Sequence, residues 1–195
     1  TGVIELRVTR EGRVVVNMGI PRLLPAEIPF VADAPAIVYP VDVNGEQVEL
    51  SVVNMGNPHG VLVVDDVSTA PVERLGPLLE PHPRFPAKAN IGFMQVLSRD
   101  AVRLRVFERG VGETLACGTG ACAAVVAGQR RGLLNARVSV RLPGGELFIE
   151  WQGEGTPVMM EGPASRVFDG QLRLPGERPQ RRSQERPGKG ARQGR

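Results

Sequence analysis

Gly118-Thr-Gly-Ala-Cys-Ala-Ala-Val-Val-Ala-Gly-Gln-Arg-Arg131 is the longest run of small and apolar residues that could form a helix in this chain. It is apolar nearly all round, and Gly132 follows it as a typical helix-ending residue. Because a helix that is apolar on all sides is buried, this pattern predicts a helix inside the protein. Its small side chains let neighbouring strands approach closely, and Arg130 and Arg131 suit the negative end of a helix.

Short β-branched or alternating runs, separated by Pro, Gly, Asn or Asp, surround this helix and predict strands. The predicted strands are Val3–Val8, Arg13–Asn17, Val48–Val53, Val61–Val64, Ile91–Leu97, Val102–Phe107, Val138–Leu142, Glu146–Trp151, Val158–Glu161 and Ser165–Phe168. Residues 72–79, after Pro71, predict a short helix, whereas the many prolines between residues 20 and 40 indicate a loop. The sequence therefore predicts a soluble, mixed α/β (α+β) protein.

The formal charge of +3 is unevenly distributed along the chain. Residues 171–195 carry eight Lys or Arg and two Asp or Glu, so the preceding residues are mildly acidic. These residues contain no basic stripe with interleaved aromatics, no apolar run of membrane-spanning length and no signal-peptide pattern. We therefore expect a cytoplasmic protein that binds neither nucleic acid nor membrane. Residues 175–195 are rich in Pro, Gly, Arg, Gln and Ser, and are predicted to form a disordered basic tail.

Cys117 lies between a polar glycine-containing loop and the predicted helix. Gly118 and Gly120 let backbone N–H groups turn toward a bound anion, and the positive start of a helix favours thiolate over thiol. Cys117 is therefore the first candidate for a reactive residue. Cys122 is predicted to be structural, because it lies within the apolar helix about 140° around the axis from Cys117. The two Cα atoms would be roughly 8 to 9 Å apart, which is too far for a disulfide.

Further polar residues lie at the ends of predicted strands. His59, within the loop Asn54-Met-Gly-Asn-Pro-His-Gly60, is placed to orient or tune a thiol, although Asn-Pro alone also marks a turn. Asn90 precedes one strand and Glu108-Arg109 ends another, so we expect these side chains to converge at one sheet edge. Arg pairs with carboxylate and Glu accepts from ammonium, which suits an amino-acid ligand. The Cys and His spacing fits no zinc site, and no phosphate-binding fingerprint is present, so neither metal nor cofactor is expected.

The sequence closely resembles the diaminopimelate epimerase family, whose members interconvert LL- and meso-diaminopimelate without a cofactor. The blocks that carry the resemblance are Asn17–Gly19, Asn54–His59, Arg84–Pro86, Ala89–Phe93, Glu108–Ala123, Leu142–Gly145 and Gly162–Ala164. Together they extend over nearly everything from residue 1 to about residue 174. A match in this order is highly specific.

The resemblance implies a two-base mechanism, in which two cysteines face each other across a small amino-acid substrate. One acts as thiolate and removes the Cα proton, and the other acts as thiol and delivers a proton to the opposite face. Cys117 matches the second of these cysteines, and His59 and Glu108 match positions that modulate the thiol pKa values. The substrate contacts implied by the match are Asn57, Asn90, Glu108, Arg109, Gly118 and Thr119.

The family fold implied by the resemblance has two similar domains, each a mixed β-sheet wrapped round a central helix, with the site in the cleft. On that template, residues 1–17 are a remnant of an N-terminal domain, residues 18–162 form a complete C-terminal domain, and residues 163–174 return as a strand to the first. The family's first cysteine has no counterpart here. We therefore expect a fragment that is inactive alone, from a parent enzyme that forms a homodimer.

Two alternatives remain open at this point. Proline racemase-like enzymes also carry a cysteine in a Cys-Gly-Thr-Gly loop, although Asn57-Pro-His59 and the lead-in Glu108–Thr114 disfavour that family. The other alternative is a non-catalytic fragment or binding module, because a chain with one of two bases would not invert a Cα centre efficiently.

Overall fold

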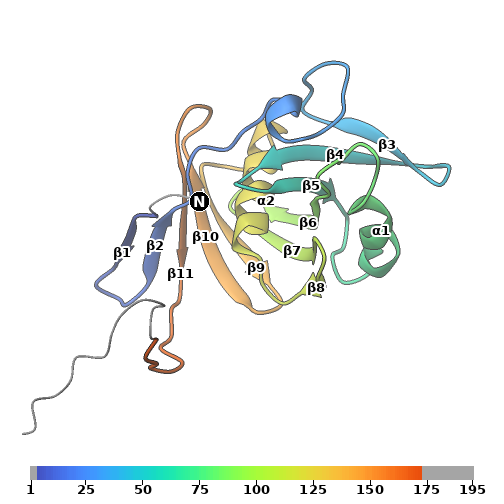
Figure 1. The fold of residues 1–195 in the computed structure, drawn as a ribbon. Coiled ribbons are helices and arrows are strands. Elements are labelled where there is room, and N and C mark those ends of the chain that lie inside the picture. Colours follow the sequence, from blue (N-terminus) through green and yellow to red (C-terminus); the bar gives the residue numbers. More distant parts are fainter. Residues whose placement is uncertain (1–3, 173–195) are drawn as a thin grey trace, which may run out of the picture. The chain divides into compact units, whose positions relative to one another are not determined.

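The computed structural model describes residues 4–172 (Figure 1), and these are divided between Ala164 and Ser165 into two units. All helices and strands of the described residues lie in the first unit. Its strands are β1 (Leu6–Val8), β2 (Val14–Asn17), β3 (Tyr39–Val43), β4 (Glu46–Asn54), β5 (Pro58–Val63), β6 (Asn90–Ser98), β7 (Ala101–Glu108), β8 (Gly112–Thr114), β9 (Arg137–Leu142), β10 (Gly145–Trp151) and β11 (Val158–Gly162). Its helices are the 3-10 helix η1 (Pro25–Glu27), α1 (Val72–Leu79) and α2 (Gly118–Arg130).

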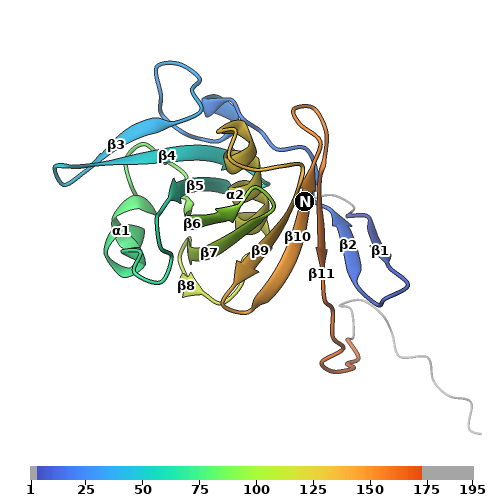
Figure 2. The same cartoon turned by 180° about the vertical axis from the view of Figure 1, so that it is seen from behind.

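The strands of this unit form one mixed sheet in the order β1-β2-β11-β10-β9-β7-β6-β5-β4-β3, with β8 paired to β7. The pairs β5–β6 and β7–β9 are parallel, and the other pairs are antiparallel. Figures 1 and 2 show the sheet curving around α2, which contacts β4, β5, β6, β7, β10 and β11. This arrangement confirms the mixed sheet wrapped round a central helix.

Helix α2 is buried along almost its whole length, from Gly120 to Gly128. The small side chains allow the surrounding strands and loops to approach its backbone closely. At Gly128, for example, a Cβ atom would lie only 2.4 Å from the Cδ1 atom of Leu134. The predicted buried helix is confirmed, and it ends at Arg130 rather than Arg131.

The two faces of the central strands pack against two different hydrophobic cores. Val53 and Val61 belong to the core around α2, whereas their chain neighbours Val52 and Leu62 belong to the core around α1. Successive side chains of a strand point to opposite faces, so each strand serves both cores. Burial on both faces explains why these strands are nearly continuous apolar runs in the sequence.

Most predicted elements are confirmed, including the helix over residues 72–79, but two short strands were not predicted. Strand β3 begins at Tyr39, inside the predicted loop, and lies at the edge of the sheet, where Pro40 is tolerated. Strand β8 has only three residues and begins at Gly112, whose φ is +96°. Strand β8 is too short to show an alternating pattern. Residues 39–43 alternate between buried and exposed, but they follow the proline-rich run that indicated a loop.

The prediction of a strand at Ser165–Phe168 is wrong, because residues 163–172 belong to no strand of the structure. Val167 and Phe168 are 87% and 82% exposed, so these apolar side chains do not belong to a hydrophobic core in the described part of the chain. The predicted strand over residues 3–8 appears at Leu6–Val8, and residue 3 lies outside the described range. The predicted disordered tail, residues 175–195, also lies outside the described residues. Within residues 4–172, none of the helices is long and apolar enough to span a membrane.

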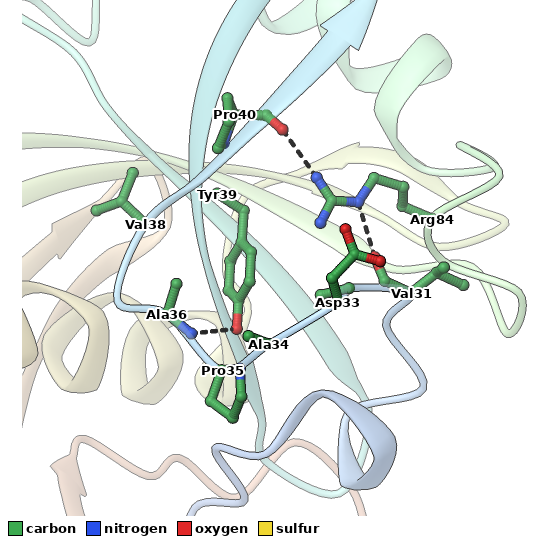
Figure 3. Close-up of a pocket in the computed structure, with 10 residues that line it drawn as sticks. Val31, Asp33, Ala34, Pro35, Ala36, Val38, Tyr39, Pro40 and Arg84 are labelled. Atoms are coloured by element: carbon green, nitrogen blue, oxygen red, sulfur yellow. Dashed lines mark hydrogen bonds between the residues drawn. The ribbon is translucent and has the colours of Figure 1, made fainter.

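Arg84 fastens the proline-rich segment between β2 and β3 (Figure 3). Its Nε atom donates to the Val31 carbonyl and its Nη1 atom to the Pro40 carbonyl, both at 2.8 Å. Its guanidinium also stacks on the ring of Phe30, 4.4 Å from the ring centroid. Arg84 and residues of this segment line a pocket of about 570 Å³. The hydrogen bonds of Arg84 take the place of the ladder hydrogen bonds that a proline-rich chain does not make. None of the predicted site residues lines this pocket.

Candidate active site

Cys117 occupies the N-cap position of α2, which confirms the predicted loop-to-helix junction. Its backbone is extended, with φ −137° and ψ 104°, and its sulfur accepts a hydrogen bond from the Gly120 N–H at 3.3 Å. The Thr119 hydroxyl lies 3.6 Å from the same sulfur. Cys117 is 6% exposed, so the thiol is held inside the protein with a fixed set of neighbours.

Burial raises the pKa of the Cys117 thiol above its ordinary value. The hydrogen bonds from Thr119 and Gly120 lower the pKa, whereas the negative charge of Glu108 raises it further. The N–H group at the helix start favours the thiolate, as expected, but lost hydration of the charged form outweighs this effect, so the net shift favours the thiol. Near neutral pH the sulfur carries a proton that it can donate.

Glu108 is the last residue of β7 and faces Gly112 of β8 across the antiparallel pair. The hydroxyl of Thr114, also in β8, donates a hydrogen bond to Glu108 Oε1. This bond fixes the carboxylate in the position from which its charge acts on the Cys117 thiol. Thr114 was not predicted as a site residue, because its contact with Glu108 depends on the pairing of a strand that the sequence does not reveal.

His59, in β5, is 1% exposed, and its Nε2 atom lies 2.9 Å from the Asn57 side-chain oxygen. Because an amide oxygen only accepts, the ring nitrogen donates this hydrogen bond. Burial lowers the pKa of His59 from 6.5 to about 3, and the positive charge of Arg109 acts in the same direction. His59 is therefore neutral near neutral pH and holds the Asn57 amide in one orientation.

Asn90 begins β6 and is the register partner of His59 in the parallel β5–β6 pair. Its buried side chain donates from Nδ2 to the Pro58 carbonyl at 3.4 Å and accepts at Oδ1 from the Arg109 N–H at 2.9 Å. Asn90 thus joins the start of β5 and the start of β6 to the turn that follows β7. The predicted convergence of Asn90 with Glu108-Arg109 is confirmed.

Two kinds of hydrogen-bond donor in this part of the structure can bind an anion. Arg109 is exposed, and its Nη1 atom donates to the Ala87 carbonyl at 2.9 Å. At the start of α2, Cys117 supplies acceptors for the N–H groups of Gly120 and Ala121. The preceding N–H groups, those of Gly118 and Thr119, have no acceptor among residues 4–172. A guanidinium and a helix N-terminus are both suited to a carboxylate.

Cys122 lies only five residues beyond Cys117 but in different surroundings. It is 0% exposed, and burial raises its pKa to about 12, with a smaller contribution from the charge of Cys117. Both cysteines are free thiols. In the described part of the chain, no three His, Cys, Asp or Glu side chains form a group that could hold a metal ion.

The fold is shared with solved amino-acid racemases and epimerases. A probable proline racemase from Agrobacterium radiobacter K84 matches with a TM-score of 0.55 and 18% sequence identity, over 85% of this chain and 56% of its own. A hydroxyproline epimerase from Agrobacterium vitis matches with a TM-score of 0.55 and 17% identity, over 83% of this chain and 54% of its own. At this identity the likeness defines the class of fold.

The amino-acid sequence then places the chain in one family. The family model described as diaminopimelate epimerase matches residues 51–167. The diaminopimelate epimerases of Ectopseudomonas mendocina (strain ymp) and Pseudomonas paraeruginosa are 62% and 64% identical over 174 and 173 residues, which is 89% of this chain. The chain belongs to the diaminopimelate epimerase family, and it spans 63% of the length of these relatives.

Proposed function

We propose that the complete gene product interconverts LL- and meso-diaminopimelate by acid–base chemistry at Cα, with Cys117 acting on one face of the substrate. The observation that carries this proposal is the buried thiol at the start of α2, beside Glu108, in a chain of the diaminopimelate epimerase family. The racemases that share the fold are 17–18% identical to this chain, far below the identity of the diaminopimelate epimerases. The sequence therefore supports diaminopimelate over proline as the substrate.

In the proposed reaction, a thiolate on the opposite face removes the Cα proton and becomes a thiol. The electron pair of the broken C–H bond is delocalised into the substrate carboxylate. Cys117 then delivers its Sγ proton to the other face of Cα and becomes a thiolate, so one proton is taken up and one is released. The raised pKa of Cys117 suits the donating step, since the thiol is protonated before the substrate arrives.

The carboxylate that gains negative charge needs hydrogen-bond donors at the start of α2. The N–H groups of Gly118 and Thr119 can supply them, and the positive end of the helix adds to their effect. Arg109 is placed to pair with a carboxylate of the substrate, and Glu108 to accept from an ammonium group. The side-chain amides of Asn57 and Asn90 complete the proposed contacts; His59 keeps the first in place and the Arg109 N–H the second.

Residues 1–17 and 163–174 would belong to a first domain of the complete protein, and residues 18–162 to the second. A cytoplasmic location agrees with two free thiols in the chain. The exposed apolar residues Ile4, Leu6 and Val8, in and before the edge strand β1, would be covered by the rest of that first domain. A homodimer is an expectation from the family resemblance. Light scattering of the complete gene product tests the dimer.

The substrate assignment is tested by assaying the complete gene product with LL-diaminopimelate and with L-proline. We expect turnover of LL-diaminopimelate and none of proline, and the reverse result would identify a proline racemase-like enzyme. The 195-residue chain is assayed in parallel. We expect it to be inactive, because Cys122 is sealed within α2 and cannot serve as the second base. Near-normal epimerisation by this chain would contradict the two-thiol mechanism.

A further inference from the structure

Arg109 is presented by the turn between β7 and β8, a tight turn that contains two glycines. Gly110 and Gly112 both have left-handed backbone conformations, with φ of +73° and +96°. The turn contains one internal backbone hydrogen bond, from the Val111 N–H to the Glu108 carbonyl at 3.1 Å. A turn of this kind tolerates many conformations, because glycine restricts the backbone least. Its position therefore depends on contacts with other parts of the chain.

Glu80 provides one of these contacts from the end of α1. Its side chain is 12% exposed, and its Oε1 atom accepts a hydrogen bond from the Gly110 N–H at 3.1 Å. The same oxygen lies 3.4 Å from Lys88 Nζ, and the Glu80 carbonyl accepts from the Ala89 N–H at 3.0 Å. One residue thus connects α1, the loop that leads to Asn90, and the turn that carries Arg109.

The position of Glu80 is unusual for a carboxylate. It is the C-cap residue of α1, where the partial negative charge of a helix end disfavours an acidic side chain. Helix stability alone therefore does not account for Glu80. Lys88, which supplies the opposite charge, has a left-handed φ of +56°, which is uncommon for a residue with a side chain. The position of the carboxylate at the end of α1 is explained if it serves the Gly110 N–H.

We propose that Glu80 is a positioning residue that holds the Arg109 turn in the geometry required for substrate binding, an inference that rests on the proposed function. Asn90 fixes the N–H of Arg109, Ala87 fixes its guanidinium, and Glu80 fixes the following N–H, that of Gly110. Without the Glu80 carboxylate, the turn keeps only the contacts that Arg109 makes with Asn90 and Ala87. Arg109 then meets the substrate in a wider range of positions, which weakens binding more than it slows proton transfer.

The test compares Glu80→Ala, Glu80→Gln and a control, Glu46→Gln, in the complete gene product. Glu46 pairs with Arg74 on the outer side of α1, and both side chains are about half exposed, so its variant changes the charge near the same helix without touching the turn. For Glu80→Ala we expect KM for LL-diaminopimelate to rise about tenfold with kcat changed less than about threefold. Glu80→Gln keeps an acceptor oxygen for Gly110, so its KM should lie between those of Glu80→Ala and the wild type.

Hydrogen exchange at the Gly110 amide supplies a readout that does not require turnover. It is measured by NMR on the 195-residue chain, and we expect Glu80→Ala to accelerate it about tenfold while Glu46→Gln does not. If Glu80→Ala does not fold, Glu80→Gln supplies both readouts. Unchanged Gly110 exchange or an unchanged KM in a folded Glu80 variant overturns the proposal. If Gly110 exchanges faster in Glu80→Ala but the wild-type complete protein does not turn over diaminopimelate, the proposed function is overturned. The role of Glu80 in holding the Gly110 N–H is then retained.

Discussion

Helix α2 carries one cysteine thiol at its start, Cys117, and a second within the helix, Cys122, and the two thiols have different surroundings. Cys117 caps the helix and has Thr119, Gly120 and Glu108 as polar neighbours, whereas Cys122 lies in an apolar core at 0% exposure. The difference arises from where the helix begins: an N-cap residue meets unpaired N–H groups, and a residue one turn later meets packed side chains. The position of a thiol relative to the helix start thus decides whether it can exchange protons.

The largest change in stability is expected from protonation of His59, the buried titratable group that holds the Asn57 amide. The folded protein holds its pKa at about 3, against 6.5 ordinarily, so below pH 6.5 the unfolded chain binds a proton that the folded protein does not. Stability therefore falls as the pH decreases through this range, by about 1.4 kcal/mol per pH unit. Urea unfolding of the wild type and of His59→Gln measures this. Between neutral pH and a pH of about 4.5, the wild type should lose about 3 kcal/mol more than the variant. Equal losses would contradict a neutral, buried His59.

Alkylation distinguishes the two thiols directly. The thiolate is the reactive species, and a pKa of about 12 leaves Cys122 almost entirely protonated as well as inaccessible. We expect iodoacetamide at mildly alkaline pH to modify Cys117 at least about a hundredfold faster than Cys122 in the folded chain. Peptide mass spectrometry measures the two rates, and both thiols should react at similar rates in urea. Equal rates in the folded protein would contradict the difference in environment between Cys117 and Cys122.

The smallest effect concerns the glycines beside Cys117. A Cβ atom at Gly120 would lie 3.1 Å from Cys117 Sγ and 3.1 Å from Val106 Cγ2, between two side chains that are already packed. At Gly118 the nearest atom, also at 3.1 Å, is the sulfur of Met160, a flexible side chain that can move aside. Gly120→Ala should therefore lose about 2 kcal/mol of unfolding free energy and Gly118→Ala less than about 1 kcal/mol. Denaturant unfolding measures both, and the opposite ranking would show that the Cys117 cap is loosely packed.

The sequence was sufficient for the features that depend on local patterns. The all-round apolar run predicted the buried α2, and the glycines around Cys117 predicted the loop-to-helix junction. The direction of the Cys117 pKa shift was not predictable, because it depends on how deeply the rest of the chain buries the thiol. A helix start predicts only the hydrogen bonds, which are the smaller effect here.

The residues that support the site were not predictable for a related reason. Thr114 contacts Glu108 only because β8 folds back on β7, and Glu80 reaches Gly110 only because α1 packs near that turn. In the sequence, Thr114 is part of a polar loop and Glu80 is an ordinary acidic residue near the end of a helix. Contacts between segments distant in sequence leave no local signal. The edge strand β3 was missed for a different reason: it pairs with β4 across the two-residue turn Asn44-Gly45, but the prolines between residues 20 and 40 indicated a loop.

The role of Cys117 as the group that protonates Cα is tested most directly by solvent-isotope incorporation. The complete gene product is incubated in D₂O with LL-diaminopimelate as substrate. Mass spectrometry follows the formation of meso-diaminopimelate that carries deuterium at Cα, in the wild type, in Cys117→Ala and in Cys122→Ala. We predict labelled product at similar rates in the wild type and Cys122→Ala, and at a rate reduced by about a thousandfold or more in Cys117→Ala. Labelled product formed by Cys117→Ala at the wild-type rate would show that another group protonates Cα.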